Sequence, residues 1–148
     1  MKPLFVLVGT FGIALLITIF TGGIDYTLSG RIAMAVMLAF TALGHFLYAR
    51  GMAMMLPDAI PFRKGLVYLT GLIEVAAAIG LLIPGMETTT GWLLILFFVL
   101  MLPANIYAAI KRVDYQKATY EGPGRNYLWF RVPLQVLFIL WTYFSAIK

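Results

Sequence analysis

The sequence contains no cysteine and little charge. Without cysteine, the 148-residue chain cannot form a disulfide, a thiolate metal site, an iron–sulfur cluster or a dithiol redox pair. Charged residues make up only 11% of the chain, whereas hydrophobic residues make up 62%. A soluble domain of this size needs more charge to cover its surface. The composition therefore favours a protein that lies in a membrane.

Motifs of common catalytic and nucleotide-binding sites are also missing. The sequence has no P-loop, no G-x-S-x-G and no H-E-x-x-H. Its single histidine, His45, cannot form a zinc site alone, so we predict no metal. No cofactor can be identified from the residues. The net charge of +5 is explained more simply by membrane topology than by nucleic acid, and we predict no nucleic-acid partner.

What the sequence does contain is five long apolar stretches. A bilayer core about 30 Å thick requires about 20 helical residues, and each stretch approaches this length. The runs are continuous rather than alternating, which argues against a β-barrel. The first stretch begins like a signal peptide but lacks an A-x-A-type cleavage site, so we interpret it as a true span. We predict an all-α, polytopic helical bundle, a single transmembrane domain over 1–148, with spans at about 4–21, 32–49, 65–83, 91–110 and 127–147.

Basic residues are divided unequally between the two sides that five spans would create. One side carries Arg31 and Lys148. The other, which includes the N-terminus, carries eight: Lys2, Arg50, Arg63, Lys64, Lys111, Arg112, Lys117 and Arg125. Cytoplasmic loops of membrane proteins are enriched in Lys and Arg. The N-terminus is therefore predicted to be cytoplasmic.

Polar residues inside the spans fall at similar depths beneath the cytoplasmic surface. A helix rises about 1.5 Å per residue, which gives depths of roughly 6–13 Å for the five strongest polar groups, on four different spans. These residues are His45, Glu74, Asn105, Arg131 and Gln135. A charge at mid-span costs about 2.5–3.5 kcal/mol on insertion scales, so Glu74 should face inward. We predict a polar pocket that opens toward the cytoplasmic face.

The partner of Glu74 stays open at this stage. Glu74 can pair with Arg131, accept a hydrogen bond from Gln135 or His45, or be protonated. A pair with Arg131 could serve only to lock two helices together. Asn105 follows Pro103, and it can either bind backbone groups freed by the proline or join two helices. Gly71 lies on the same helix face as Glu74 and would allow a neighbouring helix or a ligand to approach closely.

Several short motifs, in order, resemble those of the DoxX-like family of small bacterial integral membrane proteins. The resemblance covers residues 31–144 and rests on "GHF" (44–46), the loop with Pro57 and Pro61, "TGLIE" (70–74), "IGLLIP" (79–84), "LPANIYAAI" (102–110), "RVPLQ" (131–135) and Trp141. It implies a four-helix bundle in the bacterial cytoplasmic (inner) membrane. The first span departs from that pattern as an N-terminal addition. Relatives in the family are linked to quinone-dependent oxidoreduction, and the same five polar residues lie within its motifs.

These observations favour a membrane protein whose buried pocket binds a small, partly apolar molecule, quinone-like or lipid-like. Asn105, Arg131 and Gln135 would hold the polar end of the ligand, while His45 and Glu74 would handle protons. A redox role would require an external cofactor or partner, because the chain has no redox-active side-chain set. The alternative is a non-catalytic assembly or stability subunit. Expected partners are membrane lipid and a membrane protein or a second copy of the chain.

Overall fold

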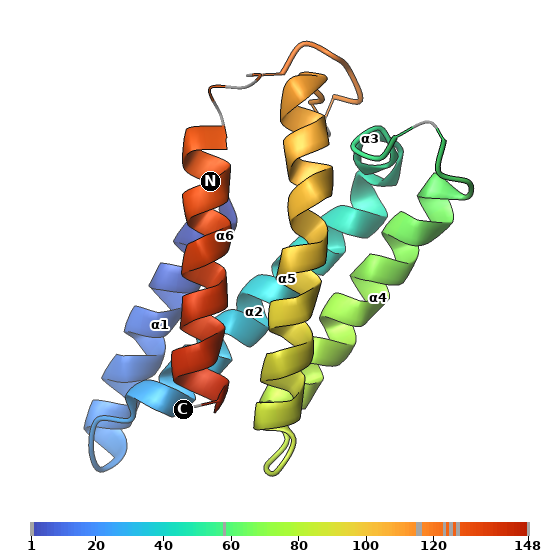
Figure 1. The fold of residues 1–148 in the computed structure, drawn as a ribbon. Helices are drawn as coiled ribbons and strands as arrows, with labels where there is room; N and C mark the ends of the chain where they lie inside the picture. The colour runs from blue at the N-terminus through green and yellow to red at the C-terminus, as the bar shows by residue number, and fades with distance from the viewer. Residues whose placement is uncertain are drawn as a thin grey trace.

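The computed structural model is an all-α bundle of long helices (Figure 1). It describes residues 2–57, 59–114, 117–122, 124, 126 and 128–147. Lys2 is described for its backbone alone, and Arg125 and Lys148, two of the basic residues used to predict orientation, lie outside the described residues. Within this part of the chain, the structure contains no strand, and Asp114 and Thr119 form an isolated β-bridge.

Five helical segments of the described chain are long and apolar enough to cross a membrane, so the protein is a multi-pass membrane protein. Four are single α-helices, and in the fifth α6 continues into the π-helical turn η2. The short helix α3 lies between α2 and α4. The bounds are α1 (Lys2–Thr21), α2 (Tyr26–Leu47), α3 (Ala49–Ala53), α4 (Arg63–Leu82), α5 (Glu87–Ile110), α6 (Leu128–Thr142) and η2 (Tyr143–Ile147).

Two helices begin earlier than the hydrophobic pattern predicts. The second begins at Tyr26 rather than at residue 32, because the Asp25 side chain caps it by accepting a hydrogen bond from the Leu28 N–H at 2.9 Å. The fourth span begins at Glu87 rather than at residue 91. Hydrophobicity marks where a helix enters hydrocarbon, whereas a helix continues through polar residues until its cap.

The loop predicted after the second span contains a helical turn instead. α2 ends at Leu47, and α3 follows after a single residue, Tyr48. The prolines Pro57 and Pro61 lie beyond α3, so they stop the chain from continuing as a helix only after this turn. α3 thereby remains close to the ends of α2 and α4.

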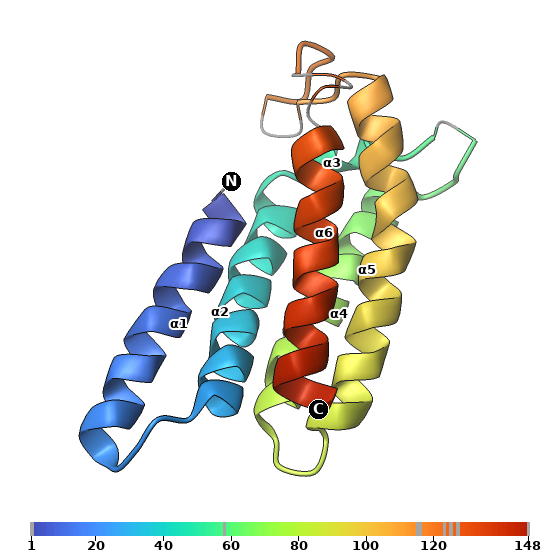
Figure 2. The ribbon, with the colours of Figure 1, turned by 60° about the vertical axis from the view of Figure 1, so that its left-hand side comes forward.

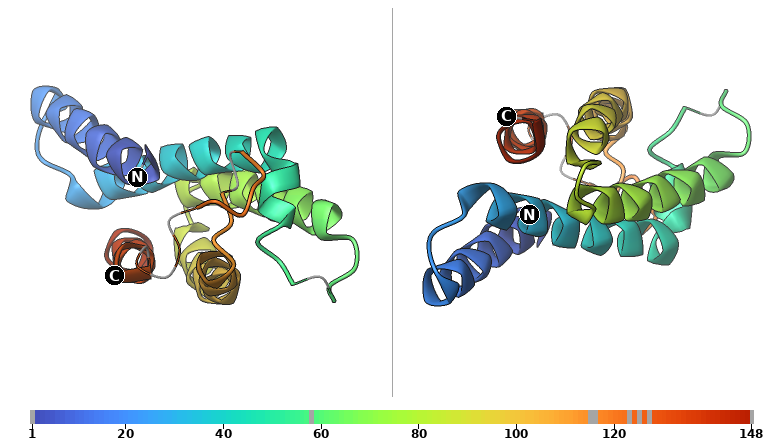
Figure 3. Two further views of the ribbon diagram at one scale, coloured as in Figure 1. Left: turned by 90° about the horizontal axis from the view of Figure 1, so that it is seen from above. Right: turned by 90° about the horizontal axis from the view of Figure 1, so that it is seen from below.

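Helices α2, α4, α5 and α6 form a closed ring (Figures 1 and 3). α2 packs against α4, α4 against α5, α5 against α6, and α6 returns to α2. α1 lies outside this ring and packs mainly on α2 (Figure 2). Much of its apolar surface is exposed. The predicted arrangement of a four-helix core with an additional N-terminal helix is therefore the one that the structure adopts.

Glycines allow the helices of the ring to approach closely. A Cβ atom added to Gly71 of α4 would lie 3.0 Å from the Cβ of His45 on α2. At the α4–α5 contact, a Cβ on Gly80 would lie 2.5 Å from the Thr90 hydroxyl oxygen. Such short distances mean that larger side chains would push the helices apart. The glycine beside Glu74 therefore sets the spacing between α2 and α4.

The two ends of the bundle differ in charge. The N-terminus of α1, helix α3, the loop after α5 and the beginning of α6 share one end, which we call the basic end (Figure 2). The described basic residues of this end are Arg50, Arg63, Lys64, Lys111, Arg112 and Lys117. At the opposite end, Arg31 at the start of α2 forms a 3.3 Å ion pair with Glu87 at the start of α5. This pair joins two helices of the ring far from the basic end.

The close contact at Gly71 predicts an unequal response to alanine. Gly71→Ala should be less stable than Gly12→Ala by about 1–3 kcal/mol, because the new methyl group presses on His45. Gly12 is the matched control, since it also lies within a membrane helix and an added Cβ would meet nothing within 4 Å. Both variants gain the same helix propensity. Unfolding in detergent micelles measures the difference, and equal stability of the two variants would contradict the close approach.

Candidate functional site

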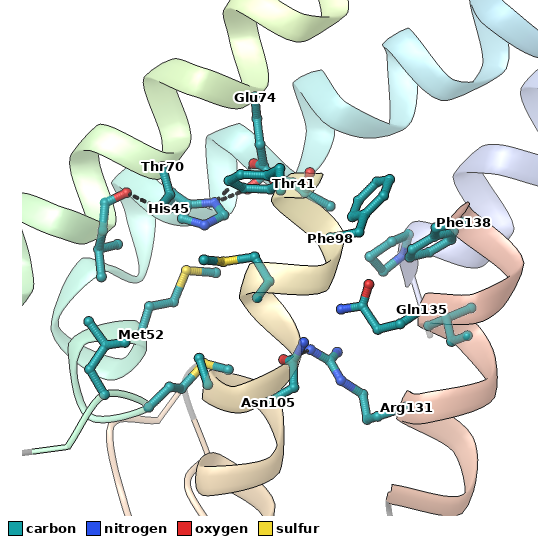
Figure 4. Close-up of a pocket in the computed structure, with 18 of the residues that line it drawn as sticks. Thr41, His45, Met52, Thr70, Glu74, Phe98, Asn105, Arg131, Gln135 and Phe138 are labelled. Atoms are coloured by element: carbon teal, nitrogen blue, oxygen red, sulfur yellow. Dashed lines mark hydrogen bonds and ion pairs between the residues drawn. The ribbon is translucent and has the colours of Figure 1, made fainter. Parts of the chain in front are cut away.

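A cavity of about 310 Å³ lies inside the ring of four helices, toward the basic end. Residues of α2, α4, α5 and α6 line it, together with Pro3 of α1 and Met52, Met55 and Leu56 of α3 and the segment after it. All five polar residues singled out from the sequence line this one cavity (Figure 4): His45, Glu74, Asn105, Arg131 and Gln135. The structure thus brings them together, while their roles in proton handling and ligand binding stay predictions.

Glu74 meets His45 across the α2–α4 contact. Glu74 is buried, with 5% of its surface exposed, and its Oε2 lies 3.1 Å from His45 Nδ1. Among the partners considered from the sequence, the structure therefore places Glu74 beside the histidine. Gly71, one turn before Glu74, is the residue that permits this approach. The carboxyl group lies among apolar helices with an imidazole beside it, which lowers the cost of its burial.

The same histidine nitrogen also contacts the backbone of its own helix. His45 Nδ1 lies 2.9 Å from the carbonyl oxygen of Thr41. A carbonyl oxygen can only accept, so Nδ1 carries the hydrogen and donates it there. Glu74 Oε2 is near enough for attraction but accepts no aligned hydrogen bond and is buried without a hydrogen-bond partner. This arrangement fixes the orientation of the ring and leaves Nε2 as the nitrogen that can gain or lose a proton.

On the other side of the cavity, Arg131 of α6 meets Asn105 of α5. Arg131 Nη2 donates a hydrogen bond to Asn105 Oδ1 (Figure 4). Of the two roles considered for Asn105, the structure supports the joining of helices, although Pro103 lies inside the same helix two residues earlier. Asn105 is 7% exposed, so its amide is shielded from lipid and holds the guanidinium at the cavity wall.

Gln135 completes the polar part of the lining. It lies four residues after Arg131 and on the same face of α6. Its side-chain Oε1 is buried and has no hydrogen-bond partner. The rest of the wall is mostly apolar and includes Met37, Phe97, Phe98, Met101, Leu134 and Phe138. The cavity therefore combines an apolar body with polar groups on opposite walls.

The sequence did not reveal every lining residue. Thr41 and Thr70 each lie four residues before a predicted site residue and thus on the same helix face, a spacing that could have identified them. Their hydroxyls donate to carbonyl oxygens of their own helices, Leu38 and Val67. Met52 and Met55 also line the cavity, because α3 folds over its end. No local pattern predicts that position.

The described residues do not assemble a metal site. No group of three or more His, Asp or Glu side chains comes together in the part of the chain that the structure covers. The polar residues of the cavity are an imidazole, one carboxyl, two amides and a guanidinium. This set is suited to hydrogen bonding and to proton exchange rather than to the binding of a divalent ion.

The fold and the cavity define a class of protein: a multi-pass helical-bundle membrane protein with a buried, partly polar cavity. The family described as a domain of unknown function (DUF8561) matches residues 34–146, about three quarters of the chain, and the protein belongs to this family. The match begins inside α2 and includes all five polar residues, whereas α1 lies outside it. No curated protein and no solved structure matches the chain.

The contact between His45 and Glu74 predicts that substitutions at the two positions are coupled. Glu74→Gln and His45→Gln, made singly and together, should deviate from additivity by about 1 kcal/mol in unfolding free energy, because each removes the same contact. Glu74→Gln combined with Arg31→Gln is the control. Arg31 lies 14 residues before His45 on α2, about 21 Å along the helix, so this pair should add within about 0.5 kcal/mol. Additivity in both pairs would contradict the contact.

Proposed function

We propose that the cavity binds a small, partly apolar molecule, quinone-like or lipid-like. The observation that carries this proposal is the open volume between the two polar pairs. A bundle locked only by its polar residues would bring Glu74 into direct contact with Arg131 at a packed centre. Here Glu74 lies beside His45, and Arg131 donates a hydrogen bond to Asn105. A cavity of about 310 Å³ lies between these two pairs. Cavities of this size, mostly apolar with a few convergent polar groups, are typical ligand sites.

In this proposal, Arg131, Asn105 and Gln135 hold the polar end of the ligand. The guanidinium donates hydrogen bonds, and the amides can donate or accept them. The phenylalanine and methionine side chains contact the apolar part. His45 and Glu74 exchange protons with the ligand, with His45 Nε2 as the exchanging atom because Nδ1 is held by Thr41. Oxidation or reduction of the ligand requires a cofactor or partner protein that carries the electrons.

We also propose that the protein is DoxX-like and lies in the bacterial cytoplasmic membrane, with the basic end in the cytoplasm. The order of the motifs over residues 31–144 supports the first part, and the uneven distribution of Lys and Arg supports the second. The cavity lies toward the basic end, so in this proposal the ligand enters from the cytoplasmic leaflet.

A second candidate is a non-catalytic assembly or stability subunit. The observation that favours it is that the polar contacts join neighbouring helices: Glu74 with His45 joins α4 to α2, and Arg131 with Asn105 joins α6 to α5. In such a subunit, α1 would present its exposed apolar face to a membrane protein or to a second copy of the chain. The two candidates differ in whether the cavity is occupied.

The ligand should be retained after mild extraction and lost when the cavity is filled. Native mass spectrometry of the wild-type protein should detect a bound small molecule. Ala104→Phe places a ring in the cavity and should abolish retention. Leu100→Phe, on the same helix but 61% exposed to the outside, is the matched control and should retain the ligand. Wild-type protein that carries no bound molecule, or equal retention by both variants, would favour the assembly subunit.

The proposed orientation can be tested by cysteine labelling, because the chain has no native cysteine to remove. Lys117→Cys lies in the exposed loop of the basic end, and Met86→Cys lies at the opposite end and is 48% exposed. In spheroplasts, a membrane-impermeant maleimide should label Met86→Cys, whereas Lys117→Cys should require permeabilisation. The reverse pattern would place the cavity end outside the cytoplasm.

A further inference from the structure

Two buried oxygen atoms of the cavity lining have no hydrogen-bond partner. They are Glu74 Oε2 and Gln135 Oε1, contributed by α4 and α6. Both are acceptors, since a carboxylate oxygen and an amide oxygen receive hydrogen bonds. Leaving a buried acceptor unsatisfied costs about 1–3 kcal/mol. The folded protein therefore keeps two unsatisfied acceptors at a site with room for a ligand.

Several hydrogen-bond donors near these two oxygens donate to other atoms. The hydroxyls of Thr41 and Thr70, which also line the cavity, donate to carbonyl oxygens of their own helices at 3.0 and 2.8 Å. His45 Nδ1 donates its hydrogen bond to the Thr41 carbonyl oxygen. One N–H of Arg131, on the same helix as Gln135, donates to Asn105. Neither Glu74 Oε2 nor Gln135 Oε1 accepts a hydrogen bond from these groups, so both can accept one from a ligand.

We infer that the ligand head carries hydroxyl groups that donate to Glu74 Oε2 and Gln135 Oε1, as in a hydroquinone or a diol with an apolar body. A head with one hydroxyl, such as a phenol, satisfies one of the two oxygens. This inference rests on the proposed function and specifies its ligand class. A head that only accepts hydrogen bonds, such as a ketone, an ether or an ester, satisfies neither oxygen. The apolar remainder of the ligand packs against Phe98, Leu134 and Phe138.

The surroundings of Glu74 favour a ligand head that donates a hydrogen bond to it. Glu74 is 5% exposed and lies among apolar helices, where a hydrogen bond to a carboxylate is stronger than in water. A carboxylate can also act as a general base, so Glu74 can take up the proton that the hydroxyl gives up. A hydroxyl is the head group that can both donate to Glu74 and release a proton. The same geometry thus links ligand choice to the proposed proton exchange.

A matched pair of probes tests this inference: tritiated para-nonylphenol and its methyl ether, which differ only in the O–H group. Binding is measured to the full-length protein in lipid nanodiscs, with empty nanodiscs subtracted. The phenol should bind about ten-fold more tightly than the ether, the factor expected for one hydrogen bond to a buried acceptor. Equal affinities would overturn the inference while leaving the proposed function intact. If neither probe binds, both fail.

Variants locate the donor contact. Gln135→Met and Glu74→Met remove the two acceptors one at a time. Because the phenol has one O–H, the variant that removes the acceptor it uses should reduce the preference for the phenol several-fold, with the affinity for the ether unchanged. Thr70→Val is the matched control, because it removes a cavity-lining hydroxyl that donates to its own helix, and it should keep the preference. The wild-type comparison of the two probes stands even if one variant fails to fold. An undiminished preference in both folded variants would overturn the assignment of these oxygens.

Discussion

A carboxyl group buried in a membrane helix needs a polar neighbour, and the position of Glu74 organises the rest of this structure. Its partner, His45, lies on a different helix. The helices α2 and α4 must therefore lie close enough for the two side chains to meet, with 3.1 Å between Glu74 Oε2 and His45 Nδ1. Gly71 permits that approach because it has no side chain where the helices are closest. The contact therefore requires two features one turn apart on the same face of α4: the polar side chain of Glu74 and the absence of a side chain at Gly71.

The second polar contact lies on the opposite side of the ring. Arg131 and Asn105 join α6 to α5, as Glu74 and His45 join α4 to α2. Because each pair forms within its own wall, neither wall needs the other for this contact, and the space between them persists as a cavity. At the far end of the bundle, the Arg31–Glu87 pair joins α2 to α5 across the ring. The few polar groups in these membrane helices thus both hold the helices together and line the cavity.

Helix type and the inward direction of Glu74 could be predicted from the sequence, because hydrophobic length and the cost of a buried charge are local properties. The partner of Glu74 could not, since His45, Gln135 and Arg131 were all within reach by depth alone. The helices α2 and α5 begin before the predicted residues, because Asp25 caps α2 and because α5 begins within polar sequence at Glu87. The methionines near α3 were missed because their place at the cavity depends on how that turn folds back over the bundle.

The proposed function depends on a cavity that holds a ligand between Glu74 and Arg131. The most direct measurement is an experimental structure of the protein extracted without stringent delipidation, at a resolution that shows small molecules. We expect elongated non-protein density inside the ring, with its polar end at Gln135 and Arg131 and its apolar part against Phe98 and Phe138. A closed centre in which these side chains pack against one another, with no space between the two polar pairs, would contradict it.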